Sequence, residues 1–277
     1  MWNTMTMSRI AFVLLLAIAA VPAHADPLWP IEREFEANLG VFFLDTDTTI
    51  RVDATNSDHG TAINLEQDLG LVHTDRFRVD AYWRMFPRHR LRFMYFDSSA
   101  SSSRQLHENI EFGDTTFPLD AFVDARFDLT IFEAAYEYSF LKRDNFEIAG
   151  TFGVHSMQVE MGLTAGAATN PDLGGVTRTG LAEATGPLPV FGLRGVWAFS
   201  DHYYIDAQAQ VFALEFDNYG GNLQDYKVSF NWLPWKHVGV GVGYNLSSTR
   251  IDIDQDRYLG RVQLDYSGAQ LFLNGAF

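Results

Sequence analysis

The chain has 277 residues, a formal net charge of −15 and no cysteine. The lack of cysteine excludes a disulfide framework and argues against thiolate metal sites. The acidic balance argues against a nucleic-acid partner, because phosphate binding requires a basic surface. Aromatic residues make up 14% of the chain, and transmembrane β-barrels use such residues in belts at the two membrane interfaces.

The first 25 residues have the pattern of a secretory signal peptide. Arg9 supplies a positive charge, residues 10–20 are apolar, and Ala23-His24-Ala25 forms an A-x-A cleavage signal. The apolar run is too short for a membrane helix, which needs about 20 residues. The chain has no cysteine that could carry a lipid at the cleavage site. We therefore expect export, cleavage before Asp26, and one mature domain over 26–277.

The next segments alternate with a period of two, which predicts strands with one apolar face. After an extended lead-in, the first predicted strand covers 35–52 and is followed by a polar loop. The second covers 76–86, where apolar residues from Phe77 to Met85 alternate with polar residues, four of which are charged. A short turn leads to the third strand, 90–96, and a serine-rich, loop-like segment that can extend the flanking strands is expected over 97–118.

The fourth and fifth predicted strands cover 121–141 and 146–164. Their apolar residues change phase, near Ile131 and Phe132 in the fourth strand and near Ser156 in the fifth. A one-residue slip in a regular strand predicts a β-bulge. A long loop rich in Gly, Ala and Thr is expected over 165–186. The later predicted strands cover 189–199, 203–216, 225–232, 238–246 and 258–277.

The last predicted strand ends the chain on Phe277. Its apolar face holds Ala269, Leu271 and Leu273, and the other face holds Gln270 and Asn274. Farther back, the apolar residues Val262, Leu264 and Tyr266 alternate with the polar residues Arg261, Gln263 and Asp265. We expect the polar residues to face the barrel interior. The Ser-Gly pair at 267–268 can be a kink or a hairpin turn.

The connections alternate in length, with short turns after the second, fourth, sixth and eighth strands and long polar loops after the first, third and fifth. This pattern is typical of bacterial outer-membrane barrels. We predict an all-β, transmembrane, antiparallel up-and-down barrel of about ten strands, with eight to twelve compatible with the pattern. The alternative is a secreted sandwich or lipocalin-like barrel with its apolar face inside.

The cleavage signal, the alternating final strand and Phe277 resemble the small bacterial outer-membrane β-barrel proteins, the OmpA-, OmpW- and OmpX-like class. The resemblance implies a Gram-negative outer-membrane location and contact with membrane lipid and lipopolysaccharide. It also implies that Phe277 contributes to the signal read by the barrel assembly machinery. We assign no functional residue of this chain from the resemblance. We expect a monomer without a cofactor or metal.

The predicted inward face is rich in charge of both signs, and unpaired buried charge is very costly. We expect a largely plugged lumen held by ion pairs, or else a narrow, gated pore whose arginines steer anions. The predicted residues are Arg76, Arg78, Asp80, Arg84, Arg90, Arg92, Glu133, Glu137, Arg194, Asp206, Asp225, Lys227, Arg261 and Asp265.

Two enzyme alternatives have candidate residues. An omptin-like protease would use an outer Asp/His pair, for which Asp58-His59, His73 and His107 are available. A lipid A deacylase-like enzyme would use a His-Ser dyad, for which His155-Ser156 is the candidate. Adjacent strand residues point to opposite faces, so the dyad would need a bulge.

Asp252, Asp254 and Asp256 alternate near a predicted hairpin tip. Hard cations bind several carboxylate oxygens, so this is a candidate cation site, and the alternative is a solvated tip. The favoured interpretation is a non-enzymatic barrel with a structural or binding role through its outer loops, or with passive passage of a small solute. The alternative is an outer-membrane hydrolase.

Overall fold

The computed structural model describes residues 29–54, 60–165, 177–216, 219–255 and 258–277. The predicted signal peptide lies outside the described residues. Ten long strands form an antiparallel sheet that closes through pairing of β13 with β1. They are β1 (Phe35–Val52), β3 (Val72–Phe86), β4 (His89–Gln105), β7 (Phe122–Lys142), β8 (Phe146–Ala165), β9 (Arg178–Ala198), β10 (Tyr203–Phe216), β11 (Tyr219–Trp232), β12 (Val238–Gln255) and β13 (Tyr258–Ala276). In the described part of the chain, no helix is long and apolar enough to cross a membrane.

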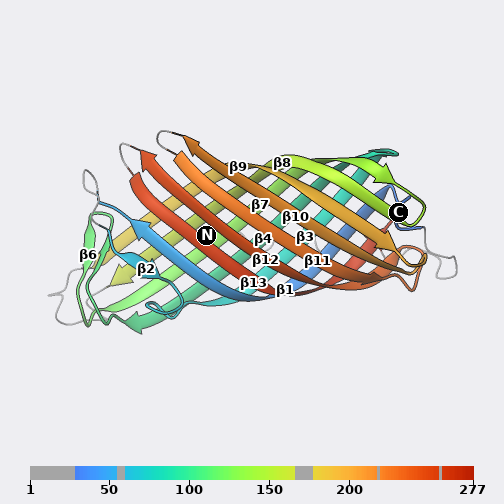
Figure 1. Ribbon diagram of the computed structural model, residues 1–277. Helices are drawn as coiled ribbons and strands as arrows, with labels where there is room; N and C mark the ends of the chain where they lie inside the picture. Colours follow the sequence, from blue (N-terminus) through green and yellow to red (C-terminus); the bar gives the residue numbers. More distant parts are fainter. Residues whose placement is uncertain (1–28, 55–59, 166–176, 217–218, 256–257) are drawn as a thin grey trace.

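The up-and-down topology is confirmed, since each long strand pairs with the next along the chain. The turns 87–88, 143–145, 199–202 and 233–237 lie at one end, together with the carboxyl terminus (Figure 1). The other end carries three short strands: β2 (Ala62–Asn64), β5 (Ile110–Phe112) and β6 (Thr115–Phe117). Short turns are periplasmic in outer-membrane barrels, so the end with the short turns is named the periplasmic end and this second end the extracellular end. The Ser-Gly pair at 267–268 lies within β13 and is not a turn.

Several strands are longer than predicted. β4 includes residues 97–105 of the serine-rich segment, where an extension of the strand was allowed for, and β9 includes residues 178–186, which were expected in a loop. The outward side chains in the β4 extension are polar, and those in the β9 extension mix Leu181 with polar residues such as Thr179 and Glu183, so the apolar alternation that marks a strand fades there. The backbone pairing nevertheless continues, as in the register from Asp97↔Thr130 to Gln105↔Phe122.

Large apolar side chains on the outer surface form a belt around the barrel. Each strand contributes, for example Phe43, Trp83, Phe93, Phe132, Phe152, Phe191, Val211, Val228, Val242 and Leu271, all of which are exposed. Aromatic rings also gather near the periplasmic turns. The ring centroids of Trp197 and Phe199 are 4.4 Å apart, and Tyr203 stacks on Trp232. An apolar band bordered by aromatics is the surface that a barrel presents to lipid.

The two predicted phase slips are wrong. The pairing of β7 with β8 is unbroken through Ile131, Phe132 and Ser156, and its register shift lies between Ser139 and Leu141. The alternation of buried and exposed residues also continues through both places. What changes along the strand is the polarity of each face. The inward face of β7 carries Glu137 and Glu133 in one half and apolar residues in the other.

The barrel interior therefore has two layers. The extracellular layer is a large apolar core that includes Phe42, Phe96 and Phe127. The long connections add apolar side chains to it, among them Leu65 and Phe112. Toward the periplasm, the interior is charged and polar. Inward glycines of β12 make room inside: a Cβ on Gly241 would lie 2.2 Å from the ring of Phe272.

Candidate functional site

The charged layer is the most distinctive chemical feature of the described residues. At its periplasmic side, Arg84 binds Glu147 through two hydrogen bonds of 2.9 Å. Arg90 lies 3.1 Å from the same carboxylate and 3.3 Å from Glu137. All four side chains are buried. Strands β3, β4, β7 and β8 are thus linked by one chain of alternating charges.

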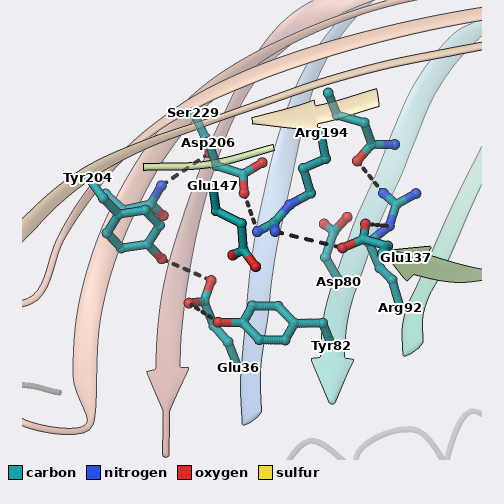
Figure 2. A network of polar contacts seen from close by, with 12 residues as sticks. Glu36, Asp80, Tyr82, Arg92, Glu137, Glu147, Arg194, Tyr204, Asp206 and Ser229 are labelled. Carbon is teal, nitrogen blue, oxygen red and sulfur yellow. Dashed lines mark hydrogen bonds and ion pairs between the residues drawn. The ribbon is translucent and has the colours of Figure 1, made fainter. Parts of the chain in front are cut away.

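Glu137 is the centre of this network. Besides Arg90, it contacts Arg92 at 3.1 Å and Arg194 at 3.7 Å. Arg92 continues to Glu133 at 2.6 Å, and Arg194 pairs with Asp206. Figure 2 shows Arg92, Arg194 and Glu137 converging from different strands into the space enclosed by the barrel.

A second group lies where the charged layer meets the apolar core. Arg78 donates to both oxygens of Asp80, at 2.9 and 3.0 Å, and to Asn245 at 2.9 Å. Lys227 contacts Asp80 at 3.1 Å. Asp225 accepts a hydrogen bond from Asn245 at 3.0 Å. The guanidinium of Arg78 also lies over an aromatic ring of the apolar core.

The sequence interpretation missed the periplasmic end of the network. Glu36 accepts hydrogen bonds from Tyr204 at 2.9 Å and from Tyr82 at 3.4 Å (Figure 2). It also pairs with Arg33 at 3.3 Å. Arg33 precedes β1 and is fully buried, so no strand periodicity could place it. Glu147 could have been found, because it lies on the same inward row of β8 as Thr151 and His155.

The network is balanced in charge. It contains seven cationic side chains, Arg33, Arg78, Arg84, Arg90, Arg92, Arg194 and Lys227, and seven carboxylates, Glu36, Asp80, Glu133, Glu137, Glu147, Asp206 and Asp225. The cavity within it has a volume of about 30 Å³, which suits one or a few water molecules rather than a solute.

Two predicted lumen residues lie on the outer surface, and a third, Arg76, lies on the inward face but beyond the charged layer. Arg261 and Asp265 are on the outer surface of β13, while Val262, Leu264 and Tyr266 are buried inside. The prediction for this part of β13 was therefore inverted. Above the membrane the outside is water and the inside is the apolar core, so the faces exchange polarity. Arg76 is on the inward row of β3, half-buried at the extracellular side, where it donates to a backbone carbonyl of β1 at 2.9 Å.

The candidate cation site is described only in part. Asp252 lies between Arg250, at 3.1 Å, and Arg261, with which it also pairs. The carboxylate of Asp252 is therefore already paired with two arginines and is not free to bind a cation. The side chain of Asp254 and the whole of Asp256 lie outside the described residues. Within the described part of the chain, no group of three acidic or histidine side chains could hold a metal ion.

The enzyme candidates do not converge where they are described. His155 is buried and faces Glu133 at 3.2 Å, whereas Ser156 is on the opposite face of β8. Asp58-His59 and the side chain of His73 lie outside the described residues, and His107 is exposed. Asp201 and His202 are 2.7 Å apart, but at a periplasmic turn.

No family model and no curated protein sequence matches the chain. Solved structures do. The outer membrane protease OmpT from Escherichia coli aligns with a TM-score of 0.53 and 10% identity, over 90% of this chain and 98% of its own. Ail of Yersinia pestis aligns with a TM-score of 0.36 and 9% identity, over 86% and 99%. The CymD monoaromatic hydrocarbon channel aligns with a TM-score of 0.36 and 11% identity, over 100% and 64%.

At these identities the likeness concerns the fold alone. The closed ten-stranded sheet, the apolar outer belt and the alignment with OmpT agree with one another. The chain therefore has the fold of the small bacterial outer-membrane β-barrels.

Proposed function

We propose that this protein is a closed, non-conducting outer-membrane barrel that acts through its extracellular surface rather than by passing a solute. The observation that carries the proposal is the filling of the interior by two successive layers. The balanced charge network leaves a cavity of only about 30 Å³. Above it, aromatic rings of three strands meet, with Phe42 6.0 Å from Phe96 and 6.1 Å from Tyr266.

The alternative of an anion-selective pore has less support. An anion pore requires cationic groups that face a water-filled path. Arg84, Arg90 and Arg92 each contact at least one carboxylate at 3.1 Å or less. Their charge is thus already neutralised within the protein. A hydrolase has less support because no described His–Ser or carboxylate–His pair converges at the extracellular end.

Single-channel recording in a planar bilayer tests the proposal. The refolded protein, with folding verified by heat-modifiable gel mobility, is expected to give no conductance steps under conditions where a porin conducts. A variant that truncates Arg92, Glu133, Arg194 and Asp206 together to serine is also expected to remain silent, because the apolar layer still closes the barrel. Discrete anion-selective steps of the unmodified protein, reduced when Arg78 and Arg92 are neutralised, would refute the proposal.

A further inference from the structure

The pairing of strands around the barrel stops early between β9 and β10. It ends at the pair Phe191↔Val211, although β9 begins at Arg178 and pairs with β8 along its length. In the described part of the chain, no strand pairs with the other side of residues 178–190. Phe191 belongs to the apolar belt, and Thr185 lies six residues farther along the strand, roughly 20 Å away. This unpaired part of β9 therefore rises above the membrane on the extracellular side.

Two hydrogen bonds at the periplasmic end of β9 show which backbone groups face the unpaired side. The N–H of Ala198 donates to the carbonyl of Asn145, next to β8, whereas the N–H of Phe199 donates to Tyr203 of β10. Backbone groups of successive residues point to opposite sides of a strand, and the register between β8 and β9 has no shift. The odd-numbered residues of β9 therefore face the unpaired side.

Two prolines lie where the pairing with β10 ends. Pro187 and Pro189 are odd-numbered and have no N–H, so they cannot donate to a strand on the β10 side. They cost no hydrogen bond to β8, because their nitrogens point away from it. Farther from the membrane, Leu181, Glu183 and Thr185 each present an N–H and a carbonyl on that side. We call residues 181–185 the free edge of β9.

A second break in the wall, between β1 and β3, is covered by the chain itself. Their pairing ends at Val41↔Phe77. Beyond it, Leu65 donates to the carbonyl of Thr48, and Glu66 accepts hydrogen bonds of 2.9 Å from the N–H and the hydroxyl of Thr48. Among the described residues, no segment does the same for the free edge of β9. An unpaired row of donors and acceptors is a template for another strand.

The outward side chains beside the free edge are acidic and apolar. Glu183 is directly opposed to Glu160 of β8, and both are exposed. Like charges in this position destabilise a sheet, and neither carboxylate forms an ion pair with a described arginine or lysine. Leu181 is 69% exposed, more than any other large apolar side chain in the described ranges. A neighbouring strand with a cationic residue beside Glu183 and an apolar residue beside Leu181 would satisfy both positions.

We infer that the free edge of β9 binds an extended segment of a partner protein outside the cell, which adds to the sheet as a further strand. The segment has a lysine or arginine opposite Glu183 and an apolar residue opposite Leu181. In strand addition, main-chain hydrogen bonds give affinity and alternate side chains give specificity. The inference rests on the proposed function, because it names a kind of partner for the extracellular surface. A second copy of the chain suits the edge less well, since it would bring another Glu183 to the same edge.

Fluorescence anisotropy of labelled peptides mixed with the refolded full barrel in detergent tests the inference. The probe is a capped peptide of nine residues that alternates threonine and valine, with lysine at its fifth position and leucine at its seventh. Antiparallel pairing then places the lysine opposite Glu183 and the leucine opposite Leu181. A second peptide has glutamate in place of the lysine. A third keeps the lysine but has N-methyl groups on the amides of its third, fifth and seventh residues, which face β9.

The unmodified barrel is expected to bind the lysine peptide about tenfold more tightly than the glutamate peptide and not to bind the N-methylated peptide. Glu183→Lys is expected to reverse the preference between the first two peptides. Thr185→Pro is expected to weaken binding of the lysine peptide about tenfold, because it removes an N–H from the free edge. The matched control is Glu108→Lys, an equal change of charge at an exposed residue between β4 and β5, which is expected to leave binding unchanged.

Equal binding of the three peptides, no binding of the lysine peptide, or equal effects of Glu183→Lys and the control would overturn the inference. A dimer of the unmodified barrel that Thr185→Pro separates, seen by light scattering, would overturn it in favour of a second copy. Heat-modifiable gel mobility verifies the folding of each variant. A barrel that binds no peptide but gives no conductance steps would leave the proposed function intact, whereas conductance steps would refute the proposed function separately.

Discussion

Replacement of Glu137 by glutamine tests the charged layer most directly. Its carboxylate contacts three guanidinium groups, those of Arg90, Arg92 and Arg194, and it is completely buried. Removal of one partner from a buried ion pair costs about 3–5 kcal/mol. Each of the three arginines keeps another carboxylate, so we expect the lower value, about 3 kcal/mol. This corresponds to a change of roughly 100-fold in the folding equilibrium.

The assay is reversible urea unfolding in lipid vesicles, followed by tryptophan fluorescence and by heat-modifiable gel mobility. The control is Asp128→Asn, which removes an ion pair with Arg126 on the outer surface. Surface pairs of this kind contribute about 0.2–1 kcal/mol. If Glu137→Gln lowered the free energy of unfolding by less than 1 kcal/mol, the three contacts would not form a tightly coupled, buried network, and the reasoning for a closed lumen would fail.

Three further changes test other parts of the barrel. Gly241→Val is expected to prevent correct folding, seen as loss of the heat-modifiable band, because its side chain would overlap the ring of Phe272; normal folding would show that this wall can shift. Phe96→Ala is expected to cost about 3–5 kcal/mol in urea unfolding, since the ring is 2% exposed within the apolar core; a cost below 1 kcal/mol would mean that the core is loosely packed. Phe277→Ala is expected to slow assembly into outer-membrane vesicles by the barrel assembly machinery but to leave final stability nearly unchanged, because the ring is 43% exposed and contacts mainly His237; unchanged assembly kinetics would remove Phe277 from the assembly signal.

Local alternation was enough to predict most of the membrane-spanning part. In β3, the apolar row ending at Met85 and the charged row from Arg78 to Arg84 face opposite sides, as expected from a period of two. Turn chemistry and connection length also gave the strand count and the topology. These features depend on residues that are close in sequence, so a single chain read in order reveals them.

The pairing of the charges could not be predicted in this way. Arg78 and Asn245 are 167 positions apart, and Arg92 and Gln208 are 116 apart. Their contacts depend on the stagger between strands and on closure of the sheet. The same holds for rows of outward side chains such as Tyr226–Leu246–Ser267–Asp45, which combine residues of β1 and of the last three strands only because β13 pairs with β1.

The amino-acid sequence by itself determined that each strand has two chemically different faces, and that a barrel of about ten strands would bury charges of both signs. It did not determine which face meets which medium along the whole strand. In β13 the outward row runs from Arg261 and Asp265 to Leu271 and Leu273, and the inward row runs from Val262 to Asn274. Only the tertiary structure gives each residue its height relative to the apolar belt. The physical reason is that the surroundings change from water to lipid outside the barrel, and from an apolar core to an ion-paired layer inside it.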